Sequence, residues 1–102
     1  MINIIFELDF GVGQPSVQRT MLWDLPVPVV GSCLEFGPNG HEPTGAFEAV
    51  VMFVMMNGYE GTVYVKLQEL GAEEAEVCTL NRELVEQCLD LTAEAILRRQ
   101  RG

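Results

Sequence analysis

The residues of this chain that could perform catalysis are few and far apart. The only histidine, His41, is followed by Glu42 in a long loop rich in glycine and proline. A histidine and a carboxylate can act together as a general base, but neighbours in sequence do not orient each other, and no nucleophile is signalled nearby. Ser16 and Ser32 lack the elbow motif that exposes a nucleophilic serine. We therefore interpret His41 as a solvent-exposed bystander and predict no enzymatic activity.

The three cysteines are the remaining candidates for site chemistry, as metal ligands. Cys33, Cys78 and Cys88 include no close pair of the kind that typifies a zinc site, so even with His41 as a fourth ligand we expect neither a metal nor a cofactor. An odd number of widely spaced cysteines is also not a disulfide framework. Free cysteines among apolar residues are typical of a reducing compartment, so we expect a cytoplasmic protein.

The sequence also lacks the signals that direct a protein to secretion or to a membrane. The first residues of the chain lack a basic segment, and Glu7 and Asp9 interrupt the apolar run too early for a signal peptide. No apolar run approaches the roughly 20 residues that a membrane-spanning helix needs. We expect a soluble protein.

Acidic side chains far outnumber basic ones. The 102 residues include fifteen Asp and Glu against six Lys and Arg, and the formal net charge is −9. Such a charge repels phosphate backbones, so direct binding of nucleic acid is disfavoured, whereas a basic protein, including one that itself binds nucleic acid, is a suitable partner. Acidity can also serve only to keep an apolar protein soluble. The acids predicted to contact a basic partner are Glu73, Glu74, Glu76, Glu83, Glu86, Asp90 and Glu94.

The longest apolar run lies in the middle of the chain and is followed by a turn. Residues 49–56 are all apolar, Asn57 and Gly58 form a strong turn signal, and residues 61–67 then alternate between apolar and polar. This order predicts a strand, a turn and a second strand. Because the first strand is apolar throughout, we expect it to be buried on both faces. Its methionines either fill gaps in the core or form an adaptable binding surface.

Other strands are predicted on both sides of this hairpin. Alternation of apolar and polar residues predicts a strand over residues 2–10, and a mixed apolar segment predicts another over residues 17–25. Residues 29–36 are expected to form a short strand that is bent or bulged at Gly31. A further short strand is expected over residues 77–80.

A C-terminal helix is predicted from residue 82 to about residue 100. Asn81 is a suitable N-cap, and Leu80 and Val85 have the spacing of a hydrophobic staple. Acids near the start and three arginines near the end complement the helix dipole. The apolar side chains recur at helical spacing, which indicates a helix that covers one face of the sheet. These side chains are Leu84, Cys88, Leu91 and Ala95, widened by Val85, Leu89 and Ile96.

These elements together predict an α+β fold and a single domain over residues 1–102. We expect a small, antiparallel, curved sheet or partial β-barrel of about five strands with one C-terminal amphipathic helix. The length suits one hydrophobic core and is too short for two.

The function predicted from these features is that of a non-enzymatic protein-binding protein, an acidic adaptor or inhibitor that engages a basic partner. In a sharper form of this hypothesis the acidic face mimics the charge of nucleic acid. In size and charge alone, the chain is similar to small acidic phage-encoded inhibitors, anti-CRISPR proteins among them.

Two alternatives remain open from the sequence. The first is a structural or assembly subunit, for instance of a phage particle, that self-associates as a homodimer or larger assembly through Val50, Met52, Val54 and Met56 of the apolar strand, because strand edges offer unpaired backbone groups. The second is a small-molecule-binding barrel lined by Phe36, Phe47, Phe53 and the methionines. Ordinary core packing of these aromatic residues is the favoured interpretation.

Overall fold

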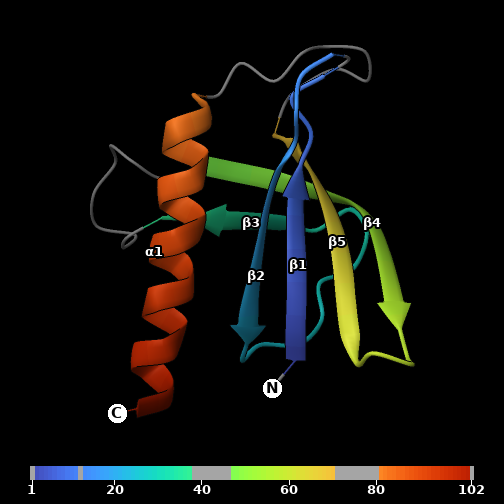
Figure 1. The fold of residues 1–102 in the computed structure, drawn as a ribbon, viewed down its shortest axis with the longest axis vertical. Coiled ribbons are helices and arrows are strands. Elements are labelled where there is room, and N and C mark those ends of the chain that lie inside the picture. The colour runs from blue at the N-terminus through green and yellow to red at the C-terminus, as the bar shows by residue number, and fades with distance from the viewer. Residues whose placement is uncertain (1, 12, 38–46, 71–80, 102) are drawn as a thin grey trace.

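The computed structural model describes residues 2–11, 13–37, 47–70 and 81–101, which form five strands and one helix (Figure 1). The predicted α+β class with a curved sheet and a C-terminal helix is confirmed. The elements are β1 (Ile2–Leu8), β2 (Val17–Trp23), β3 (Cys33–Phe36), β4 (Phe47–Asn57), β5 (Thr62–Glu69) and α1 (Arg82–Arg101).

The five strands make one mixed sheet in the order β2-β1-β5-β4-β3. The prediction of a purely antiparallel sheet is wrong, because β5 runs parallel to β1 while the other three pairings are antiparallel. The reason is the crossover after β2, which carries the chain to the far edge. The β4–β5 hairpin then returns toward the middle, and β5 joins β1 in the same direction.

The core lies on the inner face of the curled sheet and is dense in aromatic rings. Phe6 is fully buried, and its ring meets those of Trp23 and Phe36 edge-on, at 5.2 Å between centroids in both cases. Phe36 in turn stacks on Phe47 at 5.3 Å. These contacts join β1, β2, β3 and β4 across the inside of the curl, so one cluster of rings holds strands that are distant in the sheet.

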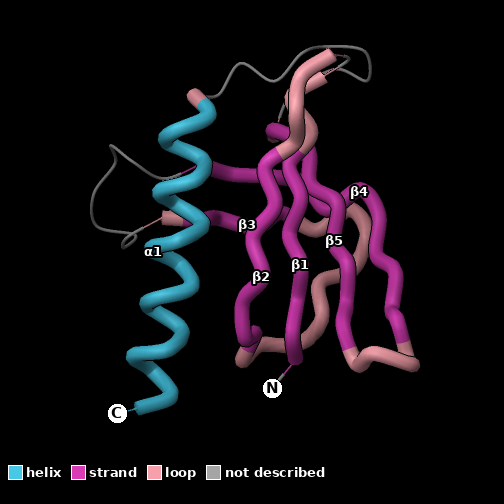
Figure 2. The backbone as a smooth tube through the Cα atoms, viewed as in Figure 1, coloured by secondary structure: helices cyan, strands magenta, loops and turns pink. Residues whose placement is uncertain are grey.

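The helix closes the open side of the curl. It packs against β2 and β3, the two outer strands of the sheet (Figure 2). Its buried residues are Val85, Cys88, Leu89 and Ile96, so the helix has an apolar face as predicted. The centre of that face is shifted, because Leu84, Leu91 and Ala95 of the predicted stripe are only partly buried. Edge strands expose unpaired backbone groups, and a covering helix is one way in which proteins protect them.

The ends of the helix are fixed by side chains that the sequence partly signals. The predicted cap at Asn81 is confirmed, since its Oδ1 accepts hydrogen bonds from the backbone N–H groups of Glu83 (2.9 Å) and Leu84 (3.3 Å). Near the C-terminus, Arg99 donates two hydrogen bonds to the Asp24 carboxylate, at 3.1 and 2.8 Å, just after β2. The first contact is local and the second is tertiary.

The strand predicted over residues 29–36 begins only at Cys33, because a tight turn precedes it. Ser32 N–H donates to the Val29 carbonyl (3.1 Å), and Gly31 has a φ of 92°, which a residue with a side chain rarely adopts. The irregularity expected at Gly31 is therefore a turn. The strand predicted over residues 77–80 and the loop that contains His41 and Glu42 lie outside the described residues.

Candidate functional site

Among the residues that the structure describes, the second half of β4 has no neighbouring strand on one side. β3 pairs with β4 only from Phe47 to Val50, and one more residue, Val51, bonds to the segment that leads into β3. Beyond Val51, no residue that the structure describes pairs with β4 on the side away from β5. Figure 1 shows this half of β4 bending away from α1 at the far side of the sheet.

The hydrogen bonds of Val51 define which way the backbone of β4 points. Its N–H donates to the carbonyl of Ser32 (2.9 Å), and its carbonyl accepts from the N–H of Gly31 (2.8 Å). Both groups of Val51 therefore point away from β5. Along an antiparallel pair this direction alternates from one residue to the next.

The same direction can be followed along the rest of β4 through its partners on β5. Alternate residues of β5 direct their backbone groups away from β4, and so do the β4 residues opposite them. The pairs whose backbone groups point away from each other are Val51 with Leu67, Val54 with Val65, and Met56 with Val63. The N–H and C=O groups of Val54 and Met56 thus point outward, on the side where β4 has no described neighbour.

The side chains of this half of β4 are apolar and exposed. Met52, Phe53, Met55 and Met56 have between 46% and 67% of their surface exposed. The prediction that this strand is buried on both faces is wrong. The physical reason is the position of β4 in the sheet, since β3 covers only its first half and α1 packs against strands on the other side of the curl.

A β-bulge at Met52 decides which face each side chain occupies. The register with β5 shifts between Val51 and Phe53, so Met52 is an extra residue. Phe53 and Met55 pair with Lys66 and Tyr64 and lie on the outer face, where the Phe53 and Tyr64 rings meet edge-on at 6.3 Å between centroids. A strand without this bulge would keep one alternation throughout.

The four residues predicted for self-association are placed differently by the bulge. Val50 lies before it and shares the outer face with its partner Gln68, whereas Val54 and Met56 share the inner face with buried β5 residues. Met52 lies at the bulge itself. Only Val54 and Met56 therefore lie on the free part of the edge, since Val50 pairs with Cys33 of β3, and the four residues do not form one face.

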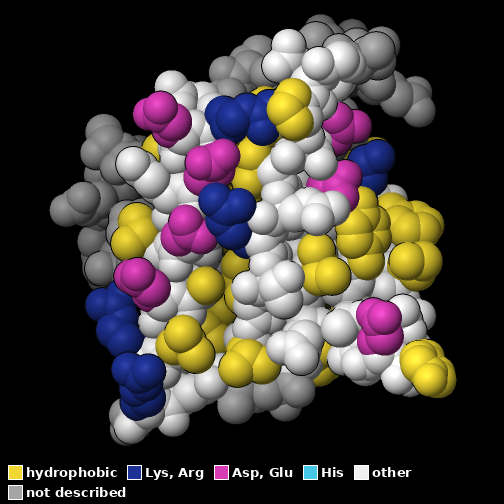
Figure 3. All heavy atoms as spheres, in the orientation of Figure 1, with side chains coloured by type: hydrophobic (Ala, Val, Ile, Leu, Met, Phe, Trp, Pro, Cys, Tyr) yellow, Lys and Arg dark blue, Asp and Glu magenta, His cyan; other side chains and the backbone are white. Residues whose placement is uncertain are grey.

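Two further exposed apolar groups flank this part of β4, and the sequence analysis missed both. Tyr59 is 98% exposed at the tip of the β4–β5 hairpin, and Val29 and Val30 are 68% and 63% exposed on the turn beside Val51. An aromatic residue after Asn-Gly was the available signal for the first. We call these residues together the β4 edge surface: Val29, Val30, Met52, Phe53, Val54, Met55, Met56 and Tyr59. Figure 3 shows hydrophobic side chains gathered over the β4 and β5 side of the molecule.

The hairpin tip that presents Tyr59 is held by Asn57. Its Oδ1 accepts hydrogen bonds from the N–H groups of Tyr59 and Glu60, both at 3.1 Å, and its carbonyl accepts one from Gly61 at 2.9 Å. The predicted Asn-Gly turn is thus confirmed as a hydrogen-bonded connection. The Tyr59 side chain projects from an ordered turn rather than from an unbonded loop.

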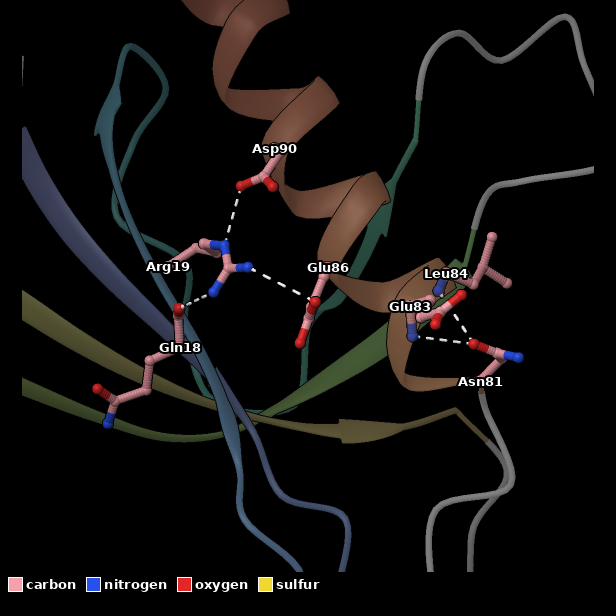
Figure 4. Close-up of polar contacts among 7 residues, drawn as sticks. All are labelled: Gln18, Arg19, Asn81, Glu83, Leu84, Glu86 and Asp90. Atoms are coloured by element: carbon pink, nitrogen blue, oxygen red, sulfur yellow. Dashed lines mark hydrogen bonds and ion pairs between the residues drawn. The ribbon is translucent and has the colours of Figure 1, made fainter.

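The predicted acidic surface of the helix is a separate feature. Glu83, Glu86, Asp90 and Glu94 fall within roughly 80° of one another on a helix with 3.6 residues per turn, so they share a face. Arg19 of β2 reaches this face (Figure 4). Its Nε donates to Asp90 at 2.9 Å, and its Nη2 is 3.9 Å from Glu86.

Arg19 therefore offsets part of the negative charge of the helix face. Glu83 and Glu94 are exposed, on either side of the two acids that Arg19 contacts. The other three acids predicted to contact a partner, Glu73, Glu74 and Glu76, lie outside the described residues.

A small polar cluster on the outer face joins β1 and β5. Glu7 accepts a hydrogen bond from Gln18 and is also bonded to Tyr64 and close to Lys66. Partial burial raises the pKa of Glu7, but these neighbours outweigh burial and the net pKa is lowered. Burial, with the bond to Glu7, raises the pKa of Tyr64 to about 12. At neutral pH the carboxylate stays charged and the phenol neutral, so the pair is suited to structure rather than to proton transfer.

Cys33 and Cys88, the cysteines that the structure describes, are not joined in a disulfide and do not come together. Cys33 is exposed on β3, and Cys88 is a buried residue of α1, where burial raises the pKa of its thiol. Over residues 2–11, 13–37, 47–70 and 81–101, no group of three His, Cys, Asp or Glu side chains is placed to hold a metal ion. Cys78 and His41 lie outside those ranges.

The aromatic residues considered for a ligand pocket lie on opposite faces of the sheet. Phe36 and Phe47 stack in the core, whereas Phe53 lies on the outer face of the sheet. Core packing, the favoured interpretation for the first two, accounts for their burial.

No protein-family model, no curated protein and no solved structure matches this chain. Within the described part of the chain, no helix combines the length and the apolar character that crossing a membrane requires.

Proposed function

We propose that this chain is a non-enzymatic protein-interaction protein and that it contacts its partner through the β4 edge surface. The observation that supports this best is that the outward backbone groups of Val54 and Met56, to which no described residue pairs, coincide with exposed apolar side chains on both faces of the same strand. An added strand would satisfy the backbone groups and cover the side chains at once.

The composition of this strand edge is unusual for a monomeric protein. Monomeric proteins commonly blunt a free strand edge with charged residues or proline, or cover it. Residues 50–58 contain neither a charged residue nor proline. An apolar edge without such protection is a hazard for aggregation unless a partner covers it.

A second candidate surface is the acidic face of α1, with a basic protein as its partner. Its support is the alignment of Glu83, Glu86, Asp90 and Glu94 on one face, in a chain whose net charge is −9. A nucleic-acid-binding protein would be such a partner, and the chain would then act as an inhibitor by charge mimicry. The contact between Arg19 and two of these acids weakens this candidate relative to β4. Under either candidate, an exposed free thiol at Cys33 fits a reducing cytoplasm.

Site-specific photo-crosslinking in cells that naturally express the chain distinguishes the two surfaces. A photoreactive amino acid replaces Met55 on the β4 edge surface in one variant and Glu94 on α1 in a second. In the control variant it replaces Thr20, an exposed residue of β2 on the same face as Met55 but three strands away. The products are identified by mass spectrometry.

We expect a discrete crosslinked product from position 55 and none from position 20. A product from position 94 with none from position 55 would mean that the partner contacts the acidic face of α1 and not the β4 edge surface. If the variants at positions 55 and 94 both yield no crosslinked product beyond that of the control at position 20, the chain does not bind a partner protein at either surface.

A further inference from the structure

We propose that the partner on the β4 edge surface is a second copy of this chain, paired antiparallel with the first about a two-fold axis at Met55. This inference rests on the proposed function, because it names the occupant of the same surface. Three features of the chain support the inference: the length of the free edge, the apolar groups at its two ends, and the distribution of charge.

The free part of the edge has a defined centre. It begins after the bulge at Met52 and ends with β4 at Asn57, so its middle residue is Met55. Antiparallel pairing about that residue places Val54 of each copy opposite Met56 of the other. Because the N–H and C=O groups of both residues point outward, each of these two pairs exchanges two hydrogen bonds. Pairing shifted toward Val51 would collide with the Gly31–Ser32 segment that already bonds to Val51, and pairing shifted toward Asn57 would leave Val54 without a partner inside β4.

The two ends of the edge complement each other under this symmetry. Tyr59 lies four residues after Met55, and Val51, beside the Val29–Val30 turn, lies four residues before it. A two-fold axis at Met55 therefore brings Tyr59 of one copy to the Val29–Val30 turn of the other, twice. The most exposed aromatic residue and the two exposed valines then cover each other. Isologous contacts of this kind are the usual form of a homodimer.

The charge of the chain also permits contact at this surface. Two copies with a net charge of −9 repel each other, and association is favoured where acids are absent. Residues 49–58 contain no ionisable side chain, whereas the acids of α1 lie by β2 and β3, on the other side of the molecule from the second half of β4 (Figure 1). Pairing through β4 keeps the two acidic helices apart.

A cysteine at the axis tests the proposed register directly. Met55 of the two copies would form a non-hydrogen-bonded pair with a Cα separation of about 4.5 Å, within the range that a disulfide bridges. The Met55→Cys variant is made with Cys33→Ser and Cys78→Ser. Oxidised glutathione should convert the two thiols to one intermolecular disulfide and itself be reduced to two thiols. Thr20→Cys in the same background is the control and should stay a single chain.

A charge swap at the same position tests the symmetry without oxidation. Met55 is half exposed on the outer face, so lysine or glutamate there should leave the fold intact, as thermal melting would verify. Wild type should sediment with the mass of two chains. Met55→Lys and Met55→Glu should each lose dimer affinity by ~100-fold or more, because like charges meet at the axis, and an equal mixture should regain the two-chain mass.

Three results would overturn the proposal. They are wild type with the mass of one chain at every concentration, no disulfide at position 55 beyond the control, and a mixture of the charged variants that stays monomeric. If purified wild type is monomeric but position 55 captures a different protein in cells, the second copy is excluded and the proposed function stands. If wild type is monomeric and position 55 also captures nothing in cells, both the proposed homodimer and the proposed function of the β4 edge surface are wrong.

Discussion

At the scale of single residues, the structure separates phenylalanines that support the fold from one that does not. Phe6 is fully buried against two other rings, whereas Phe53 is 48% exposed on the β4 edge surface. Phe6→Ala should lower the free energy of unfolding by about 3–5 kcal/mol, because it removes a large side chain and leaves a cavity. Phe53→Ala should cost about 1 kcal/mol or less. Urea denaturation of both variants checks this, and equal losses would contradict the placement of Phe53.

A second residue-scale prediction concerns pH and the contact between β2 and α1. The hydrogen bonds from Arg99 are the main cause that lowers the pKa of Asp24 below its usual value of 3.8. A lowered pKa means that the pair stabilises the fold above pH 3.8 and that this contribution is lost as the pH falls through the folded-state pKa. Asp24→Asn should therefore melt at a lower temperature than wild type at pH 7.

The difference in melting temperature between Asp24→Asn and wild type should shrink as the pH falls below 3.8, since wild type then loses the same ion pair. Glu60→Gln is the control, because Glu60 is exposed at the hairpin tip, and it should melt like wild type at both pH values. A difference that stays constant down to acid pH would show that Asp24 does not act through its charge.

Contacts such as these mark the limit of what residue types alone can predict. Asp24 and Arg99 are 75 positions apart, and Arg19 and Asp90 are 71 apart, so nothing local in the sequence brings them together. The acids of α1 are predictable as one face from their spacing. Their partial neutralisation by Arg19 follows only from the packing of α1 on β2.

At the scale of elements, the helix was the most predictable part because its signals are local. Asn81 accepts from the N–H groups of Glu83 and Leu84 as a cap should. Asn81→Ala should reduce the free energy of unfolding by about 1 kcal/mol, and Asn81→Asp, which keeps an acceptor, should retain most of it. Denaturant titration followed by circular dichroism measures both. An equal loss in both variants would mean that the acceptor oxygen at position 81 is not what stabilises the start of the helix.

The apolar strand shows why the exposure of an element is harder to predict. Eight apolar residues in a row are compatible with burial on both faces. The sequence contains no sign of the bulge at Met52 or of a β3 so short that its pairing reaches only from Phe47 to Val50. Both depend on pairing between segments distant along the chain. The existence of strands near β1, β2, β4 and β5 was predictable from period and turn residues, whereas the parallel pairing of β1 with β5 was not.

At the scale of the whole molecule, the fold protects some edges and not others. The helix covers β2 and β3, and the aromatic core joins the strands beneath it. Of the edges that the structure describes, the second half of β4 is the one without such cover, and it is also the most apolar. We propose that this edge accepts a strand from a partner.

Amide hydrogen exchange, followed residue by residue at increasing protein concentration, tests that claim most directly. In dilute protein, the amides of Val54 and Met56 should exchange fast, while those of Val51, bonded to Ser32, and of Phe53 and Met55, directed toward β5, should be protected. At high concentration, Val54 and Met56 should become protected as the edge is paired. Protection of both amides in the dilute monomer, or fast exchange at every concentration and in the crosslinked complex, would contradict the account.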